Sequence, residues 1–255
     1  MPLLPEQELK RPSSHNLVEL IRLNTYHASK KNIYLLSYSR KFDYFTNTLL
    51  ADEFNLILLY YDLHNSYKIE NGASLMMSQF AELFENEHEG IVLGHSFDGY
   101  IASQLASILP AINYCVLIDT ANTFEAEKYI NKHVVRSLFQ NLYRQIAIRR
   151  DFGYPFSLVR HVVRNLRKPK KEYDHSVRTG AEFFFKNVTF SPIINNCIFF
   201  KATRSCMGNK EHGLNWKPYV AGDFDLIDIV ADHVTIKAQY DLIASHIVRI
   251  IKENN

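Results

Sequence analysis

Short continuous apolar runs alternate with segments of helical periodicity over the first half of the chain. The helical segments carry apolar residues three or four positions apart, over 42–50, 75–84 and 101–108. The runs at 33–36, 54–61, 91–93 and 114–118 have the length and continuity of buried strands. This alternation predicts a mostly parallel sheet with helices on both faces, an α/β fold in which ligands bind beyond the carboxyl ends of the strands.

The pattern changes after Asp119. Between 124 and 188 we expect no strand, and apolar residues at helical spacing predict two or three amphipathic helices. We interpret residues 122–190 as a helical lid inserted over the strand ends. Strand patterns return at 193–194, 197–200 and 225–230, and an amphipathic helix is expected over 234–252. Residues 17–21 suit an edge strand, so we expect one domain over 1–255.

Composition is that of an ordinary globular domain, with 47% hydrophobic and 22% charged residues in 255. Cys115, Cys197 and Cys206 lack metal-site or disulfide-framework spacing, so we expect no metal and a reducing, cytoplasmic location. No apolar run approaches the ~18 residues of a membrane span, and the first residues do not resemble a signal peptide.

The net charge of +2 hides an asymmetry. Residues 124–190 contain 14 Lys and Arg against 6 Asp and Glu, whereas the rest of the chain is acidic. Such a basic segment can attract nucleic acid, an anionic membrane surface or an acidic protein, and charge alone does not choose among them.

Residues 91–100, Ile-Val-Leu-Gly-His-Ser-Phe-Asp-Gly-Tyr, have the order strand, tight turn, helix. This order is typical of a nucleophile elbow, which presents a serine hydroxyl above the sheet. Gly94 leaves room for the turn, and the Phe97 N–H, at the positive end of the new helix, is a candidate oxyanion donor. The usual G-x-S-x-G pattern has Asp98 at its last position here, with glycine displaced to 99. The alternative is a polar turn without chemistry.

A serine nucleophile at Ser96 needs a base and a group that orients the base. His233 directly follows the last strand, at the edge of the sheet where Ser96 is expected, so we predict that it is the base. Asp119 ends the strand next to the elbow strand, and the loop 201–208 after the next strand contains no carboxylate. We therefore predict Asp119 as the acid, while Asp232 shapes the loop around His233.

The second oxyanion donor is expected in the loop after the first parallel strand. Ser37, Tyr38 and Ser39 are the candidates in this glycine-free loop, and we favour the N–H of Tyr38.

Taken in order, several motifs resemble the thioesterase domains of nonribosomal peptide and polyketide synthesis, which belong to the α/β-hydrolase superfamily. They are Gly-His-Ser-Phe-Asp-Gly at 94–99, Val-Leu-Ile-Asp at 116–119, the helical insertion, Phe-Phe-Lys-Ala at 199–202, Trp216 and Val-Ala-Asp-His at 230–233. The resemblance implies an α/β-hydrolase fold and a catalytic triad of Ser96, Asp119 and His233. Two departures are Asp98, where the family usually has glycine, and the loop 37–41, where the family has a glycine-rich oxyanion loop.

The resemblance further implies that an acyl or peptidyl chain passes from the phosphopantetheine thiol of a carrier protein to Ser96, and is then released by hydrolysis or cyclisation. The phosphopantetheine arm comes with the carrier, so no cofactor of the chain's own, and no nucleic-acid partner, is expected. Carrier proteins are commonly acidic, so the basic lid is a candidate docking surface, although it also fits a solvated helical face. Its cations include Arg136, Arg144, Arg149, Arg150, Arg160, Arg164 and Lys170.

Two other functions fit the same residues. One is an esterase or lipase that acts on free acyl esters without a carrier. The other is a binding module that has the fold but lacks the chemistry, a possibility raised by Asp98 and the unusual first loop.

Overall fold

Seven strands form one sheet in the order β1-β3-β2-β4-β5-β6-β7. The computed structural model describes residues 16–39, 44–66, 68–84, 89–120, 191–204 and 214–254, so the expected lid at 122–190 and its basic surface lie outside the described residues. The strands are β1 (Val18–Arg22), β2 (Asn32–Ser37), β3 (Asn55–Tyr61), β4 (Gly90–His95), β5 (Ile112–Ile118), β6 (Asn196–Ala202) and β7 (Phe224–Ile229).

All neighbouring strands pair in parallel except β1, which runs antiparallel to β3 at the edge of the sheet. The predicted strands are confirmed with shifts of one or two residues at their ends, except that the pattern at 193–194 forms no strand and contributes only an isolated bridge between Ile193 and Val220. Parallel strands need crossover connections, and these bring the carboxyl ends of β2 to β7 to one edge of the sheet.

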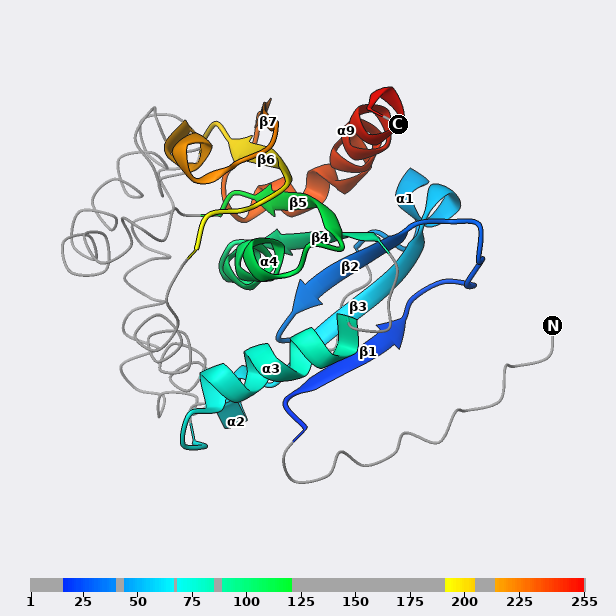
Figure 1. The fold of residues 1–255 in the computed structure, drawn as a ribbon. Helices are drawn as coiled ribbons and strands as arrows, with labels where there is room; N and C mark the ends of the chain where they lie inside the picture. Colours follow the sequence, from blue (N-terminus) through cyan, green and yellow to red (C-terminus); the bar gives the residue numbers. More distant parts are fainter. Residues whose placement is uncertain are drawn as a thin grey trace, which may run out of the picture.

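Helices cover both faces of the sheet, as predicted (Figure 1). On one face lie α3 (Gly72–Phe84), α4 (Phe97–Ile108) and the 3-10 helix η3 (Leu214–Tyr219). On the other lie α1 (Leu49–Glu53), the 3-10 helix η4 (Thr235–Gln239) and α9 (Tyr240–Glu253). The remaining described helix is α2 (Leu63–Ser66), which follows β3.

The elbow strand illustrates how the sheet divides the core. Ile91 and Leu93 pack with the cluster that includes α9, while Val92 between them packs with the cluster that includes α4. All three side chains are almost fully buried. Burial of an aliphatic side chain contributes about 1.5–3 kcal/mol, so the apolar runs of the sequence contribute strongly to the stability of the fold.

Local structure differs from prediction in two connections. The expected helix over 42–50 begins only at Leu49, because Thr48 adopts an extended conformation and its side chain caps α1 by accepting the Leu50 N–H. The segment 62–65, expected to be a loop, contributes to α2. Neither change alters the sheet or the edge at which the candidate site lies.

None of the described helices is long and apolar enough to cross a lipid bilayer.

Candidate active site

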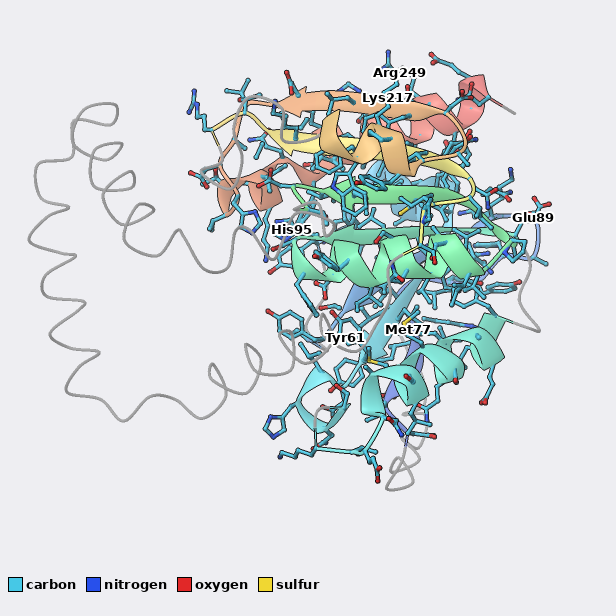
Figure 2. The ribbon with its side chains drawn as sticks, turned by 60° about the vertical axis from the view of Figure 1, so that its left-hand side comes forward. Tyr61, Met77, Glu89, His95, Lys217 and Arg249 are labelled. Carbon is cyan, nitrogen blue, oxygen red and sulfur yellow. The ribbon has the colours of Figure 1, made fainter. Side chains whose placement is uncertain are left out.

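Ser96 and Asp119 lie side by side beyond the carboxyl ends of β4 and β5. The Ser96 N–H donates to the carbonyl oxygen of Ile118 at 2.9 Å, which extends the pairing of the two strands by one residue. Figure 2 shows His95, the residue before Ser96, at one end of the sheet and Glu89 at the opposite end. The residues predicted from strand order therefore occupy the edge where α/β folds bind ligands.

Ser96 adopts a backbone conformation that few non-glycine residues adopt, with φ 57° and ψ −118°. Its side chain does not cap α4, which begins at Phe97. A serine at the N-terminus of a helix normally caps it, so this hydroxyl is not used in that way. The geometry is that of a strained strand-to-helix turn, for which a cost of about 1–3 kcal/mol is typical.

Gly94 makes this turn possible. A Cβ atom at this position would lie 2.3 Å from the carbonyl oxygen of Asp98 and 2.4 Å from the Gly99 nitrogen, both backbone atoms of α4. Strand and helix therefore approach more closely than any side chain at 94 would permit, which confirms the role expected for Gly94.

The displaced glycine of the motif also has a packing role. A Cβ at Gly99 would lie 2.0 Å from Oγ1 of Thr120, the fully buried residue after Asp119. Gly99 thus brings α4 against the residue that follows the proposed acid.

Asp119 and His233 are in direct contact, with Oδ2 of Asp119 2.7 Å from Nδ1 of His233. The Asp119 side chain is fully buried, whereas 23% of the His233 side chain is exposed. The other carboxylate oxygen, Oδ1, accepts the Ala202 N–H at 3.2 Å, and the Asp119 N–H donates to Phe200 at 2.8 Å. Asp119 is therefore held by β6 on one side and holds His233 on the other.

This contact determines the tautomer of a neutral His233 ring. A carboxylate only accepts, so Nδ1 carries the proton and Nε2 has a free lone pair. An imidazole oriented in this way can take a proton from a hydroxyl group, as the base of a serine hydrolase does. Among the described residues, no hydrogen bond joins the Ser96 hydroxyl to the His233 ring.

His95 positions His233 from the elbow side. The two rings are stacked with centroids 5.0 Å apart, and Nε2 of His95 lies 3.2 Å from the His233 carbonyl oxygen. Since a carbonyl only accepts, Nε2 carries the proton. Burial, together with the neighbouring His233 and Lys237, lowers the pKa of His95 to about 4. His95 is therefore neutral near pH 7 and ties the His233 loop to the residue before Ser96.

Asp232 shapes the loop that leads from His233 into η4, in agreement with the role expected from the sequence. Its Oδ1 accepts the N–H groups of Val234 and Thr235 at 3.0 and 2.8 Å, and its own N–H donates to the Thr235 hydroxyl. The carboxylate beside His233 thus shapes the loop, while the more distant Asp119 contacts the ring.

The two predicted oxyanion donors have different surroundings. Phe97 is the first residue of α4, directly after Ser96. In the loop after β2, the backbone N–H of Tyr38 lies near Asp98 and acts to lower the pKa of that carboxyl group. The donor favoured from the sequence is therefore a neighbour of the residue that stands in place of the usual glycine.

Asp98 is buried and has a second partner, because the Tyr61 hydroxyl donates to its Oδ1 at 2.5 Å. Burial raises the pKa of Asp98 to about 7, although the hydrogen bonds from Tyr61 and Tyr38 and the charge of Lys237 act in the opposite direction. Burial and the neighbouring carboxylate raise the pKa of Tyr61. Asp98 therefore connects α4 to the end of β3.

Sequence reasoning did not assign functions to His95 and Tyr61. His95 directly precedes the predicted nucleophile, and Tyr61 is the last residue of a strand whose neighbour leads to the oxyanion loop. Each has a polar ring side chain at the carboxyl end of a parallel strand, and this position was the signal in the sequence that could have identified it.

Within the described ranges, no group of three or more His, Cys, Asp or Glu side chains is placed to hold a metal ion.

Comparisons with known proteins identify the fold. No protein family model matches the sequence, and no curated protein has a significantly similar sequence. Solved structures are similar over nearly the whole chain at low identity. The type II thioesterase BorB from the borrelidin biosynthetic cluster has a TM-score of 0.58 and 12% identity, over 90% of this chain and 96% of that one.

Two further structures give the same result. The Vlm2 thioesterase domain has a TM-score of 0.54 and 13% identity, over 91% of this chain and 97% of that one. An epoxide hydrolase from Bacillus megaterium has a TM-score of 0.57 and 11% identity, over 93% and 99%. The chain therefore has the α/β-hydrolase fold that was predicted from its alternating strands and helices and from its motifs.

Proposed function

We propose that this chain is a serine hydrolase that releases an acyl or peptidyl chain from the phosphopantetheine thioester of a carrier protein. The observation that carries the proposal is the 2.7 Å contact between His233 and the buried Asp119, at the same edge of the sheet as the elbow residue Ser96. Ser96 is the proposed nucleophile, His233 the base and Asp119 the group that orients it. The motifs shared with thioesterase domains support the thioester as the substrate class.

The proposed reaction has two steps. The Ser96 hydroxyl attacks the thioester carbonyl while its proton passes to Nε2 of His233, and the carrier thiol leaves with that proton, so that an acyl ester remains on Ser96. Water, or a nucleophile within the acyl chain, then attacks the ester. His233 takes the proton of the attacking group and returns it to Ser96. Hydrolysis gives a free acid, and attack from within the chain gives a ring.

Negative charge develops on the carbonyl oxygen in both steps. The Phe97 N–H, at the start of α4, is the first proposed donor to this oxygen, and the positive end of the helix dipole supports it. The Tyr38 N–H is the second. Loss of one such donor typically lowers kcat by about 10²–10³.

The partner proposed is an acyl- or peptidyl-carrier protein, with the basic segment 124–190 as its docking surface. Two structural neighbours, BorB and the Vlm2 domain, are thioesterases, which favours this substrate class for a similar fold. Others are an esterase and an enol-lactonase, which favours the carrier-independent esterase as the second candidate.

A direct competition separates these two candidates. The protein is offered an acyl group as its carrier-bound thioester and the same acyl group as a simple ester, and kcat/KM is measured for each. The proposal expects a clear preference for the carrier-bound thioester. A preference for the ester would contradict the carrier-dependent function and support the carrier-independent esterase.

The third candidate is a binding module without catalysis. One observation favours it: no hydrogen bond joins the Ser96 hydroxyl to His233 among the described residues. Catalytic hydrogen bonds often form only when substrate binds, so this geometry is also compatible with turnover. A folded protein that hydrolyses neither substrate would support the binding module.

A further inference from the structure

Asp119 has a backbone conformation that residues other than glycine seldom adopt, with φ 42°. On its amino side, the peptide group is fixed by both neighbouring strands. The Ile118 carbonyl accepts the Ser96 N–H at 2.9 Å, and the Asp119 N–H donates to the Phe200 carbonyl at 2.8 Å. Aspartate tolerates a positive φ better than most residues, but the conformation still costs free energy. Contacts on the carboxyl side of Asp119 are therefore needed to keep it.

Thr120, the next residue, is held by the indole of Trp216. Nε1 of Trp216 donates to the Thr120 carbonyl oxygen at 3.1 Å, and both residues are almost fully buried. The Thr120 side chain packs against Gly99 of α4, where it leaves no room for a Cβ atom. Its hydroxyl donates to the Ile118 carbonyl at 3.4 Å. An indole N–H only donates and normally has an acceptor when it is buried, so Thr120 is fixed by the tertiary structure on the side away from Asp119.

The 3-10 helix that carries Trp216, η3, is itself attached to the sheet. The carbonyl of Tyr219, its last residue, accepts the Ile193 N–H at 2.8 Å, and the Ala221 N–H donates to the Ile193 carbonyl at 2.9 Å. Ile193 lies shortly before β6, the strand that also holds Asp119. The Trp216 ring packs in the same apolar cluster as α4. The indole is therefore a firmly anchored support.

We propose that Trp216 is a positioning residue for the proposed reaction, whose indole N–H holds Thr120 and thereby keeps Asp119 against the base. The inference rests on the proposed function, because Asp119 and His233 belong to the same Ser96 site. It gives a role to a motif residue that takes no part in the proposed chemistry. Trp216 acts through the acid and not on the substrate.

Loss of the indole hydrogen bond frees the chain directly after Asp119. The backbone of Asp119 can then relax to a negative φ, which turns its carboxylate relative to the sheet. Such a rotation lengthens the 2.7 Å contact with Nδ1 of His233. The base then loses the group that fixes its tautomer and orientation, so kcat should fall while substrate binding changes little.

The test removes the N–H and keeps the shape of the side chain. Site-specific incorporation of 3-benzothienylalanine at position 216 replaces the indole by a benzothiophene, which has sulfur in place of the N–H. 5-Fluorotryptophan retains the N–H and is the conservative replacement; it enters only this position, because the chain contains one tryptophan. Tyr34→Phe is the matched control. It removes a buried hydrogen bond between an aromatic side chain and Asn32, the first residue of β2, at the opposite end of the sheet.

The rate of labelling by a fluorophosphonate and the kcat and KM for a 4-nitrophenyl ester are measured on folded protein. We expect the benzothiophene variant to lower kcat by about fivefold to tenfold with KM unchanged, the range that corresponds to one hydrogen bond. The 5-fluorotryptophan protein should retain most of the wild-type kcat, and Tyr34→Phe should keep it. Wild-type kcat in the benzothiophene variant, or an equal loss in Tyr34→Phe, would overturn the inference.

A spectroscopic readout separates positioning from stability. The proton between Nδ1 of His233 and Asp119 gives a proton NMR signal at low field, and the position of this signal reports the strength of the contact. The signal should move upfield in the benzothiophene variant and stay in place in Tyr34→Phe. A merely structural role for Trp216 would lower the free energy of unfolding and leave the signal unmoved, so an unmoved signal in the folded variant would contradict the proposal.

A measurement on wild type covers the case in which the variants do not fold. ¹⁵N-labelled protein has one indole N–H signal, that of Trp216. This signal should shift with pH at the same midpoint as the ring signals of His233, because protonation of the ring changes the hydrogen bonding of Asp119 and hence of Thr120. An indole signal that does not follow the His233 ring would overturn the inference.

The two proposals can fail separately. If the wild-type protein neither reacts with the fluorophosphonate nor hydrolyses the ester, the proposed function fails, while the low-field signal still shows whether Trp216 holds Asp119 against His233. A reactive wild type whose kcat and low-field signal do not respond to loss of the indole N–H rejects the role of Trp216 alone.

Discussion

Nδ1 of His233 lies 2.7 Å from Oδ2 of Asp119, although 114 residues separate them along the chain. Asp119 follows β5, and His233 follows β7, so the contact is a direct consequence of the parallel sheet. It is the strongest structural support for acyl transfer at this edge. The next two predictions each change one contact around it.

Asp119→Asn should lower kcat by about a hundredfold or more. The amide can donate to Nδ1, which favours the tautomer with its proton on Nε2, and that tautomer cannot act as the base. Steady-state kinetics on folded variant protein measure this effect. The matched control is Asp232→Asn, which removes a carboxylate one residue from His233 but keeps a side-chain oxygen that can accept the N–H groups of Val234 and Thr235. Equal activity losses in the two variants would show that the carboxylate of Asp119 has no special role.

His95→Phe should lower kcat by about fivefold with little change in KM. The phenyl ring preserves the stacking on His233 but loses the hydrogen bond to the His233 carbonyl oxygen, and a bond of this kind contributes about 1 kcal/mol. His95→Ala, which loses the stacking as well, should have a larger effect. If the two variants retain wild-type kcat, His95 does not position the base.

Gly94→Ala should destabilise the protein by about 3 kcal/mol or more and abolish labelling of Ser96. The new Cβ meets backbone atoms of α4 at 2.3–2.4 Å, so the helix itself must move. Urea denaturation measures the free energy of unfolding. Gly99→Ala offers a comparison, because its nearest contact is a side-chain atom of Thr120, and we expect a smaller loss. Wild-type stability of Gly94→Ala would contradict the close approach of β4 and α4.

The ionisation of His95 should make the folded protein sensitive to acid. Its pKa is about 4 in the folded state against an ordinary value of 6.5, so the unfolded chain binds more protons between these values. Stability contributed by neutral His95 is therefore complete above pH 6.5 and is lost as the pH falls to 4, by on the order of 3 kcal/mol. Urea denaturation of wild type and His95→Phe at pH 4.5 and 6.5 measures it. An equal pH dependence in both proteins would contradict this prediction.

Asp98 should act in the opposite direction. Its pKa is about 7 in the folded state against 3.8, so the folded protein binds more protons between these values and loses stability as the pH rises through 7. Relative to wild type, Asp98→Asn should gain on the order of 3 kcal/mol of stability between pH 5 and pH 8. A difference between the two proteins that does not change with pH would show that Asp98 ionises normally.

The fold and the position of the site could be predicted from the sequence because they depend on regular patterns. Buried parallel strands read as apolar runs, and strand order places Ser96, Asp119 and His233 at one edge. Local chemistry was harder to predict. Thr48 is extended and caps α1, so the helix begins later in the chain than the hydrophobic spacing predicts. The spacing of apolar residues carries no information about this local conformation.

The partners of Asp98 could not be predicted for a different reason. Its hydrogen bond to Tyr61 crosses from α4 to a strand end that is 37 residues away along the chain, and no sequence spacing connects the two. The pattern only identified Asp98 as a departure from the usual motif. Its burial and its hydrogen bonds come from the tertiary structure.

The most direct test of acyl transfer is to identify the residue that carries a covalent label. Folded protein is treated with a fluorophosphonate, digested and analysed by mass spectrometry, alongside Ser96→Ala of confirmed fold. The account predicts a single labelled peptide with the adduct on Ser96 and no labelling of Ser96→Ala. An unlabelled wild-type protein, or an adduct that persists in Ser96→Ala, would contradict it.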